Sequence, residues 1–192
     1  RFQMAYQRSL SKSNQILDDL FKFTVDRSEG IYKRWFLEDL LANWSNVSAR
    51  DYEKYGKIPD LKQQVDFYAK NIKNAKTKSY VIISDALRYE VAKELFDEIK
   101  QDMQCKVELD HMEGIFPTIT PFGMAALLPH KELKVDIRNN KLKVLIDGES
   151  TDMPNREKVL RKTNEKSRVL KYDDMIHMKG EERKELVKGM DV

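Results

Sequence analysis

The most apolar run of the chain is followed directly by an acidic residue. Ser79 to Ser84 reads Ser-Tyr-Val-Ile-Ile-Ser, and Asp85 comes next. In open α/β sheets, ligands collect at the carboxyl ends of the strands, because the strand-to-helix loops expose their side chains and amides there. A carboxylate at that edge can hold a cation. The alternative is that Asp85 caps a helix beginning near Ala86, a role that Asp often fills.

The second candidate is a threonine that precedes a proline. Pro117 to Pro121 reads Pro-Thr-Ile-Thr-Pro, so Thr120 and Pro121 suit the first positions of a helix for backbone reasons alone. The same geometry serves catalysis, because unpaired N–H groups and the helix dipole favour an attacking alkoxide and a bound phosphate. A hydroxyl still needs a metal or a base to become a nucleophile. A metal held by Asp85 would supply this activation.

These two residues need strands and helices to position them, and the pattern after residue 77 predicts such a scaffold. The β-branched run at 79–84 predicts a strand buried on both faces. Apolar residues at every fourth position from 87 to 99 predict an amphipathic helix directly after it. A strand followed by a helix is typical of a parallel α/β unit. A second strand is expected at 106–110, and a short helix from Pro121.

The following segment predicts an antiparallel hairpin inserted into this parallel layout. Two period-2 alternations face each other across an Asn-rich turn at 138–141. A charged helix is expected at 155–165, a strand at 167–172, and a helix at 181–188 that Gly189 closes. The apolar residues of the hairpin are Leu133, Val135 and Ile137 on one strand, and Leu142, Val144 and Ile146 on the other.

The first 76 residues carry the helical period and almost no strand signal. Leu37, Leu40, Leu41 and Trp44 fall on one helical stripe, which we expect to be buried. We therefore divide the chain into a helical region at residues 1–76 and a mostly parallel α/β domain with flanking helices at residues 77–192.

Charge distinguishes these two parts only slightly. Residues 1–76 hold 14 Lys+Arg against 10 Asp+Glu, and residues 77–192 hold 21 against 22. Because the charges of the first part are interleaved, a solvated helical surface explains them better than a DNA-binding patch. Direct DNA binding is the weaker alternative.

Composition excludes several classes of protein. The 192 residues are 41% hydrophobic, which suits one or two globular domains. No stretch approaches the roughly 20 apolar residues that span a bilayer, so we expect no membrane protein. Cys105 is the single cysteine and cannot form an internal disulfide, and the opening Arg1-Phe2-Gln3 lacks a signal-peptide pattern. We therefore expect a cytoplasmic protein.

Several motifs together resemble the PglZ family, which belongs to the alkaline phosphatase superfamily and forms part of BREX bacteriophage-exclusion systems. The resemblance covers residues 77–192 and, more loosely, the helices before them. It implies a partial alkaline-phosphatase-like core preceded by a helical region. The motifs are Ser84-Asp85-Ala86-Leu87-Arg88-Tyr89-Glu90, Pro117-Thr118-Ile119-Thr120, Gly123 to His130, Asp147 to Thr151 and Asn155 to Lys158.

The resemblance also implies roles for individual residues. Asp85 resembles the first metal-binding aspartate of the superfamily, Thr120 resembles its nucleophile and a further metal ligand, and Arg88 falls where the phosphodiesterase branch has an arginine. The parent protein would be a metal-dependent phosphatase or phosphodiesterase with two divalent metals, Zn²⁺ in the simplest case. Thr120 would attack a phosphate ester, and the resulting phospho-threonine would then be hydrolysed.

The rest of the superfamily's ligand set is not recognisable in this sequence. His111, His130 and His177 each lack a partner at ligand spacing, and a lone histidine is more often a surface or hydrogen-bonded residue. We therefore expect the front half of the domain, with an incomplete metal site and little activity by itself. The competing hypothesis is a non-catalytic scaffold that docks other BREX proteins or DNA.

Overall fold

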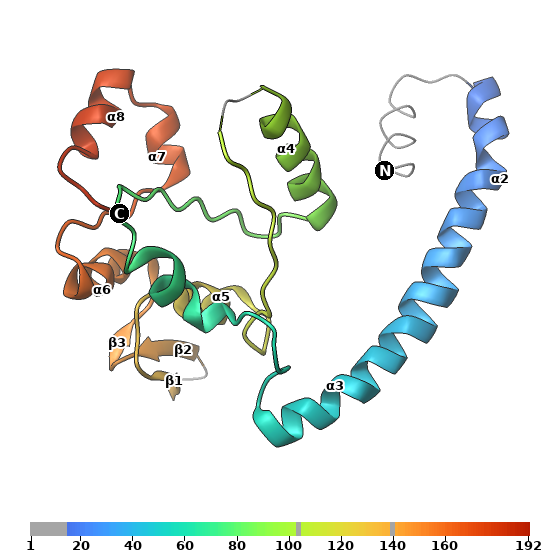
Figure 1. Cartoon of the computed structure of the whole chain (residues 1–192), viewed down its shortest axis with the longest axis horizontal. Helices are drawn as coiled ribbons and strands as arrows, with labels where there is room; N and C mark the ends of the chain where they lie inside the picture. Colours follow the sequence, from blue (N-terminus) through green and yellow to red (C-terminus); the bar gives the residue numbers. More distant parts are fainter. Residues whose placement is uncertain (1–14, 103–104, 139–140) are drawn as a thin grey trace. The chain divides into compact units, whose positions relative to one another are not determined.

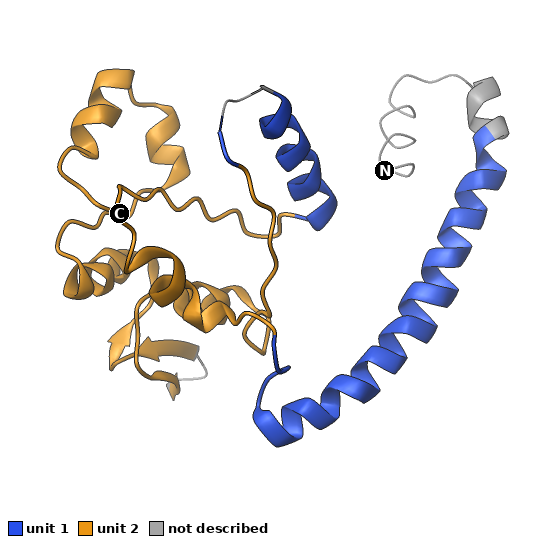
Figure 2. Ribbon diagram, in the orientation of Figure 1, with its two compact units in different colours: residues 1–60, 88–106 blue, residues 61–87, 107–192 orange. Residues whose placement is uncertain are grey.

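The structure is a computed structural model that describes residues 15–102, 105–138 and 141–192. The chain divides into two compact units (Figure 2). Unit 1 comprises Arg1–Asp60 and Arg88–Lys106, and unit 2 comprises Leu61–Leu87 and Val107–Val192. The predicted boundary at residues 76 and 77 is a different division and stays a prediction.

Unit 1 is helical throughout its described elements. Helix α2 (Gln15–Ile31) continues through a π-helical segment (Tyr32–Leu40) into α3 (Leu41–Tyr55) (Figure 1). Gly56 ends α3 in the left-handed conformation at φ 68°, where glycine pays no Cβ penalty, and its N–H bonds to the Tyr52 carbonyl. Helix α4 (Tyr89–Asp102) confirms the amphipathic helix predicted after Asp85.

The expected burial of the apolar stripe of unit 1 is wrong for the described structure. The side chains of Leu37, Leu40, Leu41 and Trp44 are all exposed, Trp44 by 54%. Their helical period is present, but the stripe lies across the junction between the π-helical segment and α3, and no described element covers it. Periodicity predicts the helix correctly, whereas burial depends on a partner surface.

Unit 2 contains the hydrophobic core. Helix α5 (Thr120–Ala126), strand β2 (Lys141–Ile146) and helix α6 (Arg156–Thr163) each turn an apolar face inward. A π-helical turn (Tyr68–Ile72) supplies Tyr68, and burial raises the pKa of its phenol. The buried core residues are Tyr68, Phe122, Ala125, Ala126, Leu128, Val144, Ile146, Val159 and Leu160.

The predicted hairpin is confirmed with its register. Strand β1 (Leu133–Arg138) pairs antiparallel with β2, and Leu133 faces Ile146, Val135 faces Val144 and Ile137 faces Leu142. Strand β3 (Glu149–Ser150) extends the sheet to three strands in the order β1-β2-β3. Residues 139 and 140 of the expected turn lie outside the described residues. Helices α7 (Tyr172–Ile176) and α8 (Gly180–Leu186) follow, joined to the sheet by α6 and a 3-10 turn (Met153–Asn155).

The predicted parallel sheet is not part of the described fold. Residues 79–84, 106–110 and 167–172 form no strand, and helix α7 begins within the last of these ranges. A strand needs a hydrogen-bonding neighbour, and in residues 79–84 the backbone bond found is Ser79 N–H to the Asp191 carbonyl, 2.8 Å. Ile82, expected to be buried on both faces, is 92% exposed. The fold is mostly helical with a small antiparallel sheet.

Within the described ranges, no helix is both long enough and apolar enough to cross a membrane.

Truncating a central core side chain is expected to destabilise unit 2. Ile146 is 1% exposed, so Ile146→Ala should lower the free energy of unfolding by about 3 kcal/mol through lost burial and a residual cavity. Chemical denaturation followed by circular dichroism measures this change. The matched control is Ile137→Ala in the same hairpin, because Ile137 is 70% exposed and its truncation should cost less than about 0.5 kcal/mol. Equal costs for the two variants would contradict this account of the core.

Candidate functional site

The two candidate residues meet in unit 2. The Thr120 hydroxyl donates a hydrogen bond to Asp85 Oδ2, with 2.9 Å between the oxygens, although the residues are far apart in the sequence. The other carboxylate oxygen, Asp85 Oδ1, accepts the Ala86 N–H at 2.9 Å. Both side chains are exposed. A hydroxyl and a carboxylate therefore form an accessible, directly bonded pair.

Helix α5 sets the direction of the Thr120 side chain. Ile119 precedes the helix in extended conformation (φ −109°, ψ 151°), and Pro121 pre-sets the helical φ of the first turn. On its other side α5 buries Phe122, Ala125 and Ala126 in the core of unit 2. Thr120 thus begins a short helix whose opposite face is anchored by core packing.

Capping does not account for either residue in this geometry. The N-cap of α5 is Ile119, with no side-chain cap bond, so the Thr120 hydroxyl serves Asp85 rather than the helix backbone. Helix α4 begins at Tyr89, whereas Asp85 binds the N–H of its immediate neighbour. The catalytic and metal-binding roles of Asp85 and Thr120 stay predictions.

The side-chain oxygens of Asp85 and Thr120 are of a kind that binds divalent cations, but two residues are too few to hold one. Carboxylate and hydroxyl oxygens are ligands that divalent metals accept in proteins. In residues 15–102, 105–138 and 141–192, however, no three His, Cys, Asp or Glu side chains gather closely enough to hold a metal ion. A metal site at Asp85 and Thr120 would need further ligands.

Arg88 has a different local setting. It belongs to unit 1, its side chain is 78% exposed, and Nη1 lies 3.9 Å from Glu90 Oε1. This geometry is that of a surface ion pair, which contributes little to stability. A catalytic role for Arg88 stays a prediction.

The three histidines have ordinary surroundings. His130 Nδ1 lies 2.7 Å from the Leu128 carbonyl oxygen, and His177 is an exposed residue at the end of α7. The backbone N–H of His111 donates to Asp110 Oδ1 at 2.8 Å, while its exposed ring nitrogen Nδ1 lies 3.8 Å from the same oxygen.

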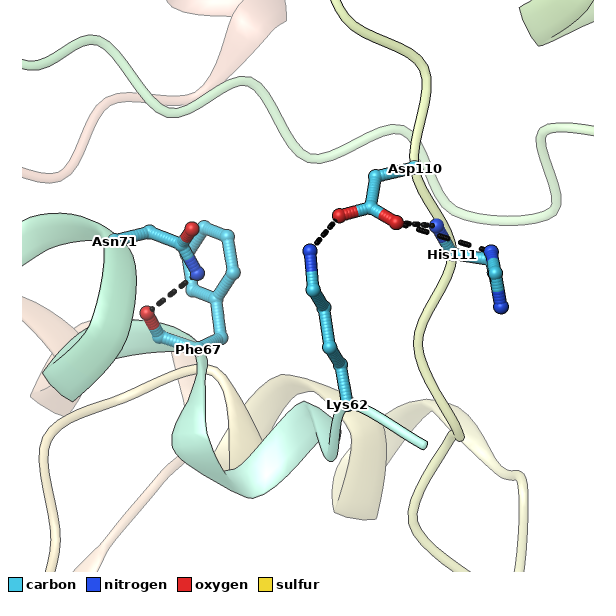
Figure 3. Close-up of polar contacts among 5 residues, drawn as sticks. All are labelled: Lys62, Phe67, Asn71, Asp110 and His111. Atoms are coloured by element: carbon cyan, nitrogen blue, oxygen red, sulfur yellow. Dashed lines mark hydrogen bonds and ion pairs between the residues drawn. The ribbon is translucent and has the colours of Figure 1, made fainter. Parts of the chain in front are cut away.

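A contact that no sequence pattern predicts lies close to Thr120 along the chain. Residues 61–66, assigned to the helical region, lie beside residues 110–115 in unit 2, where Gln63 and Glu113 form an isolated parallel bridge. The Lys62 ammonium binds the Asp110 carboxylate (Figure 3). No periodicity marks this pairing, because the paired residues Gln63 and Glu113 lie outside regular helices and strands.

Lys62 changes the acidity of its partner. The hydrogen bond from Lys62 is the main cause that lowers the pKa of Asp110, and the His111 N–H adds to it. A lowered pKa in the folded state gives stability that is present above the unfolded pKa of about 3.9 and is lost as the pH falls through the folded value.

Removing the ammonium is therefore expected to raise the pKa of Asp110. Lys62→Met retains the alkyl chain but removes the donor and the charge, so the carboxylate should protonate at a higher pH. Carboxyl ¹³C shifts recorded during an acid titration measure this change. Lys70→Met is the control, because Lys70 pairs with Asp66 at 2.8 Å instead. An unmoved Asp110 titration in the Lys62 variant would contradict the assignment.

Comparisons with known proteins find relatives that match the part of the chain containing Asp85 and Thr120. The family model of the BREX system PglZ alkaline phosphatase-like domain matches residues 62–192. The chain is 36% identical to the alkaline phosphatase-like protein BrxZ of Escherichia coli O9:H4 (strain HS) over 180 residues, which are 90% of this chain and 20% of the relative. It is 32% identical to the alkaline phosphatase-like protein PglZ of Bacillus cereus (strain H3081.97) over 193 residues, 98% of this chain and 22% of the relative.

The chain thus spans about a fifth of the length of these curated relatives. No solved structure matches it significantly. The family match includes Asp85, Thr120 and the 62–64 segment beside residues 110–115. From the extent of that match, the chain belongs to the PglZ family of alkaline phosphatase-like proteins of BREX systems.

Proposed function

We propose that the full-length protein is a metal-dependent phosphoric ester hydrolase of a bacteriophage-defence system, with Thr120 as its nucleophile. The observation that carries this proposal is the 2.9 Å hydrogen bond from the Thr120 hydroxyl to Asp85, within the region that matches the family. An exposed hydroxyl bonded to a carboxylate is poised for activation, because its proton already points at a base and its oxygen is accessible.

In this proposal Thr120 Oγ1 attacks the phosphorus of a phosphate ester in line with the leaving oxygen. The hydroxyl gives up its proton as the bond from Oγ1 to phosphorus forms, the ester bond breaks, and the leaving alcohol takes up a proton, so the step gains and loses no net proton. Water then hydrolyses the phospho-threonine, which restores the hydroxyl and releases phosphate or a phosphomonoester. Divalent metal, Zn²⁺ in the simplest case, would lower the pKa of the hydroxyl and neutralise charge on the phosphoryl oxygens.

Asp85 has two tasks in this scheme. Its Oδ2 orients the Thr120 hydroxyl, and its negative charge attracts the cation that both side chains would share. The Ala86 N–H on Oδ1 fixes the carboxylate in place. Ligands supplied by the rest of the full-length protein would complete the site.

The test is turnover of a chromogenic phosphodiester and a chromogenic phosphomonoester by the full-length protein with added Zn²⁺, alongside the Thr120→Ala variant. Loss of turnover in the variant, and in the wild type after chelation, supports the proposal. Undiminished turnover by Thr120→Ala would refute the nucleophile assignment.

A scaffold that docks other BREX proteins or DNA is the second candidate function. The exposed aromatic residues along the helices of unit 1 favour it, since Trp35 is 59% exposed and Trp44 54%. Exposed aromatic side chains are enriched at protein interfaces. A phage-defence assay separates the two functions: defence retained by Thr120→Ala would favour the scaffold, whereas defence lost with the protein complex intact would favour catalysis. In either case we propose that the protein acts in the cytoplasm with other BREX proteins.

A further inference from the structure

The side chain of Gln64 connects two backbone segments on either side of Thr120. Gln64 Oε1 accepts the Ile115 N–H at 3.0 Å. Gln64 Nε2 donates to the Gly123 carbonyl oxygen at 3.3 Å. Ile115 precedes Thr120 in the chain, and Gly123 follows it within helix α5. One amide therefore holds both flanks of the segment that carries the candidate nucleophile.

The backbone around Gln64 is itself fixed. Its N–H donates to the Glu113 carbonyl at 2.9 Å, and the Glu113 N–H donates to the Lys62 carbonyl at 2.7 Å. The Lys62 ammonium also binds the Asp110 carboxylate on the neighbouring segment (Figure 3). These contacts leave the half-buried Gln64 side chain with little freedom to turn away from Ile115 and Gly123.

The chemistry of these contacts requires an amide. A carboxamide accepts and donates at the same time, whereas a carboxylate only accepts and an ammonium only donates. An amide is also neutral, so it joins the two segments without adding charge near Asp85 and Thr120. The glutamine side chain is neutral, both donates and accepts, and is long enough to reach both backbone segments.

We propose that Gln64 is a positioning residue for Thr120, which rests on the proposed role of Thr120 as nucleophile. Gln64 acts through the backbone at Ile115 and Gly123 and touches no reacting atom. By holding the backbone at Ile115 and at Gly123, Gln64 keeps the Thr120 oxygen in its place beside Asp85. Displacement of a reacting group by about 1 Å can cost on the order of 100-fold in rate.

The test is kinetics and amide hydrogen exchange of the full-length protein carrying Gln64→Met. Methionine retains the length of the side chain but neither donates nor accepts as an amide does. We expect kcat for a chromogenic phosphodiester to fall about 10-fold to 100-fold, with KM and bound zinc changed by less than about 2-fold. The amides of residues 115–124 should exchange faster. Gln64→Glu is a second variant that retains the acceptor and loses the donor, and a similar fall in kcat is expected.

The matched control is Gln63→Met. Gln63 directly precedes Gln64 but binds the Leu61 carbonyl and Glu113, so the kcat of the Gln63→Met variant should stay within about 3-fold of wild type. The proposal is overturned if both Gln64 variants retain wild-type kcat, whether or not exchange changes. It is also overturned if kcat falls while exchange at residues 115–124 stays unchanged, or if Gln63→Met is impaired equally. Turnover by Thr120→Ala would instead show that the proposed function itself has failed.

Discussion

Replacing Thr120 by alanine in the full-length protein is expected to lower kcat for a phosphate ester by about 1,000-fold or more. The substitution removes the oxygen that forms the proposed covalent bond to phosphorus and leaves Asp85 Oδ2 without the hydroxyl that donates to it at 2.9 Å. Thr120→Ser restores a hydroxyl on a less restricted side chain, so partial activity should return. A continuous assay of the release of a chromogenic alcohol measures kcat for both variants.

Thr118→Ala is the matched control for this experiment. Thr118 lies two residues before Thr120 in the Pro-Thr-Ile-Thr motif and is likewise exposed, but the hydroxyl bonded to Asp85 is that of Thr120. Its loss should change kcat by less than about 5-fold. A large loss with Thr118→Ala and a small one with Thr120→Ala would reverse the assignment of the nucleophile.

The second large effect is expected from Asp85→Asn. Asparagine retains the shape of the side chain and can still bind the Ala86 N–H, but it removes the negative charge that would attract a cation. We expect weaker metal binding and a fall in kcat on the order of 100-fold or more. Excess Zn²⁺ should restore part of the activity, because a higher zinc concentration compensates for the weaker zinc affinity and the Thr120 hydroxyl is still present.

Zinc content after dialysis and activity against zinc concentration provide the two measurements. The control is Asp173→Asn, an exposed aspartate in the first turn of α7, which should leave both quantities unchanged. Equal zinc binding by wild type and Asp85→Asn would exclude Asp85 as a ligand. Full activity in that variant would exclude the orienting role as well.

Local patterns predicted several elements correctly. The alternation of Leu133 to Ile137 against Leu142 to Ile146 specifies a hairpin, because a one-residue slip would turn Val144 and Ile146 away from the core. The helices α4, α5, α6 and α8 also follow from apolar period, proline position and charge. Each of these signals acts between residues that are near in sequence.

The parallel strands could not be decided in this way. The run at 79–84 has the β-branched composition of a buried strand, yet composition does not supply a neighbour, and Ile82 is exposed in the structure. The 62–64 segment shows the opposite case, a backbone pairing without a strand pattern in the sequence. It carries no strand signal, but Gln63 pairs with Glu113, because the tertiary structure brings these two distant residues together.

The sequence by itself determined the family resemblance, the hairpin with its register, and Asp85 and Thr120 as the residues whose types suit phosphoryl chemistry. Only the tertiary structure decided that the Thr120 hydroxyl donates to Asp85 rather than to a helix backbone, and that Gln64 holds Ile115 and Gly123 on either side of it. The reason is physical. Periodicity and turn chemistry depend on neighbours along the chain, whereas the partner of a hydrogen bond between distant residues depends on how the core of unit 2 places α5.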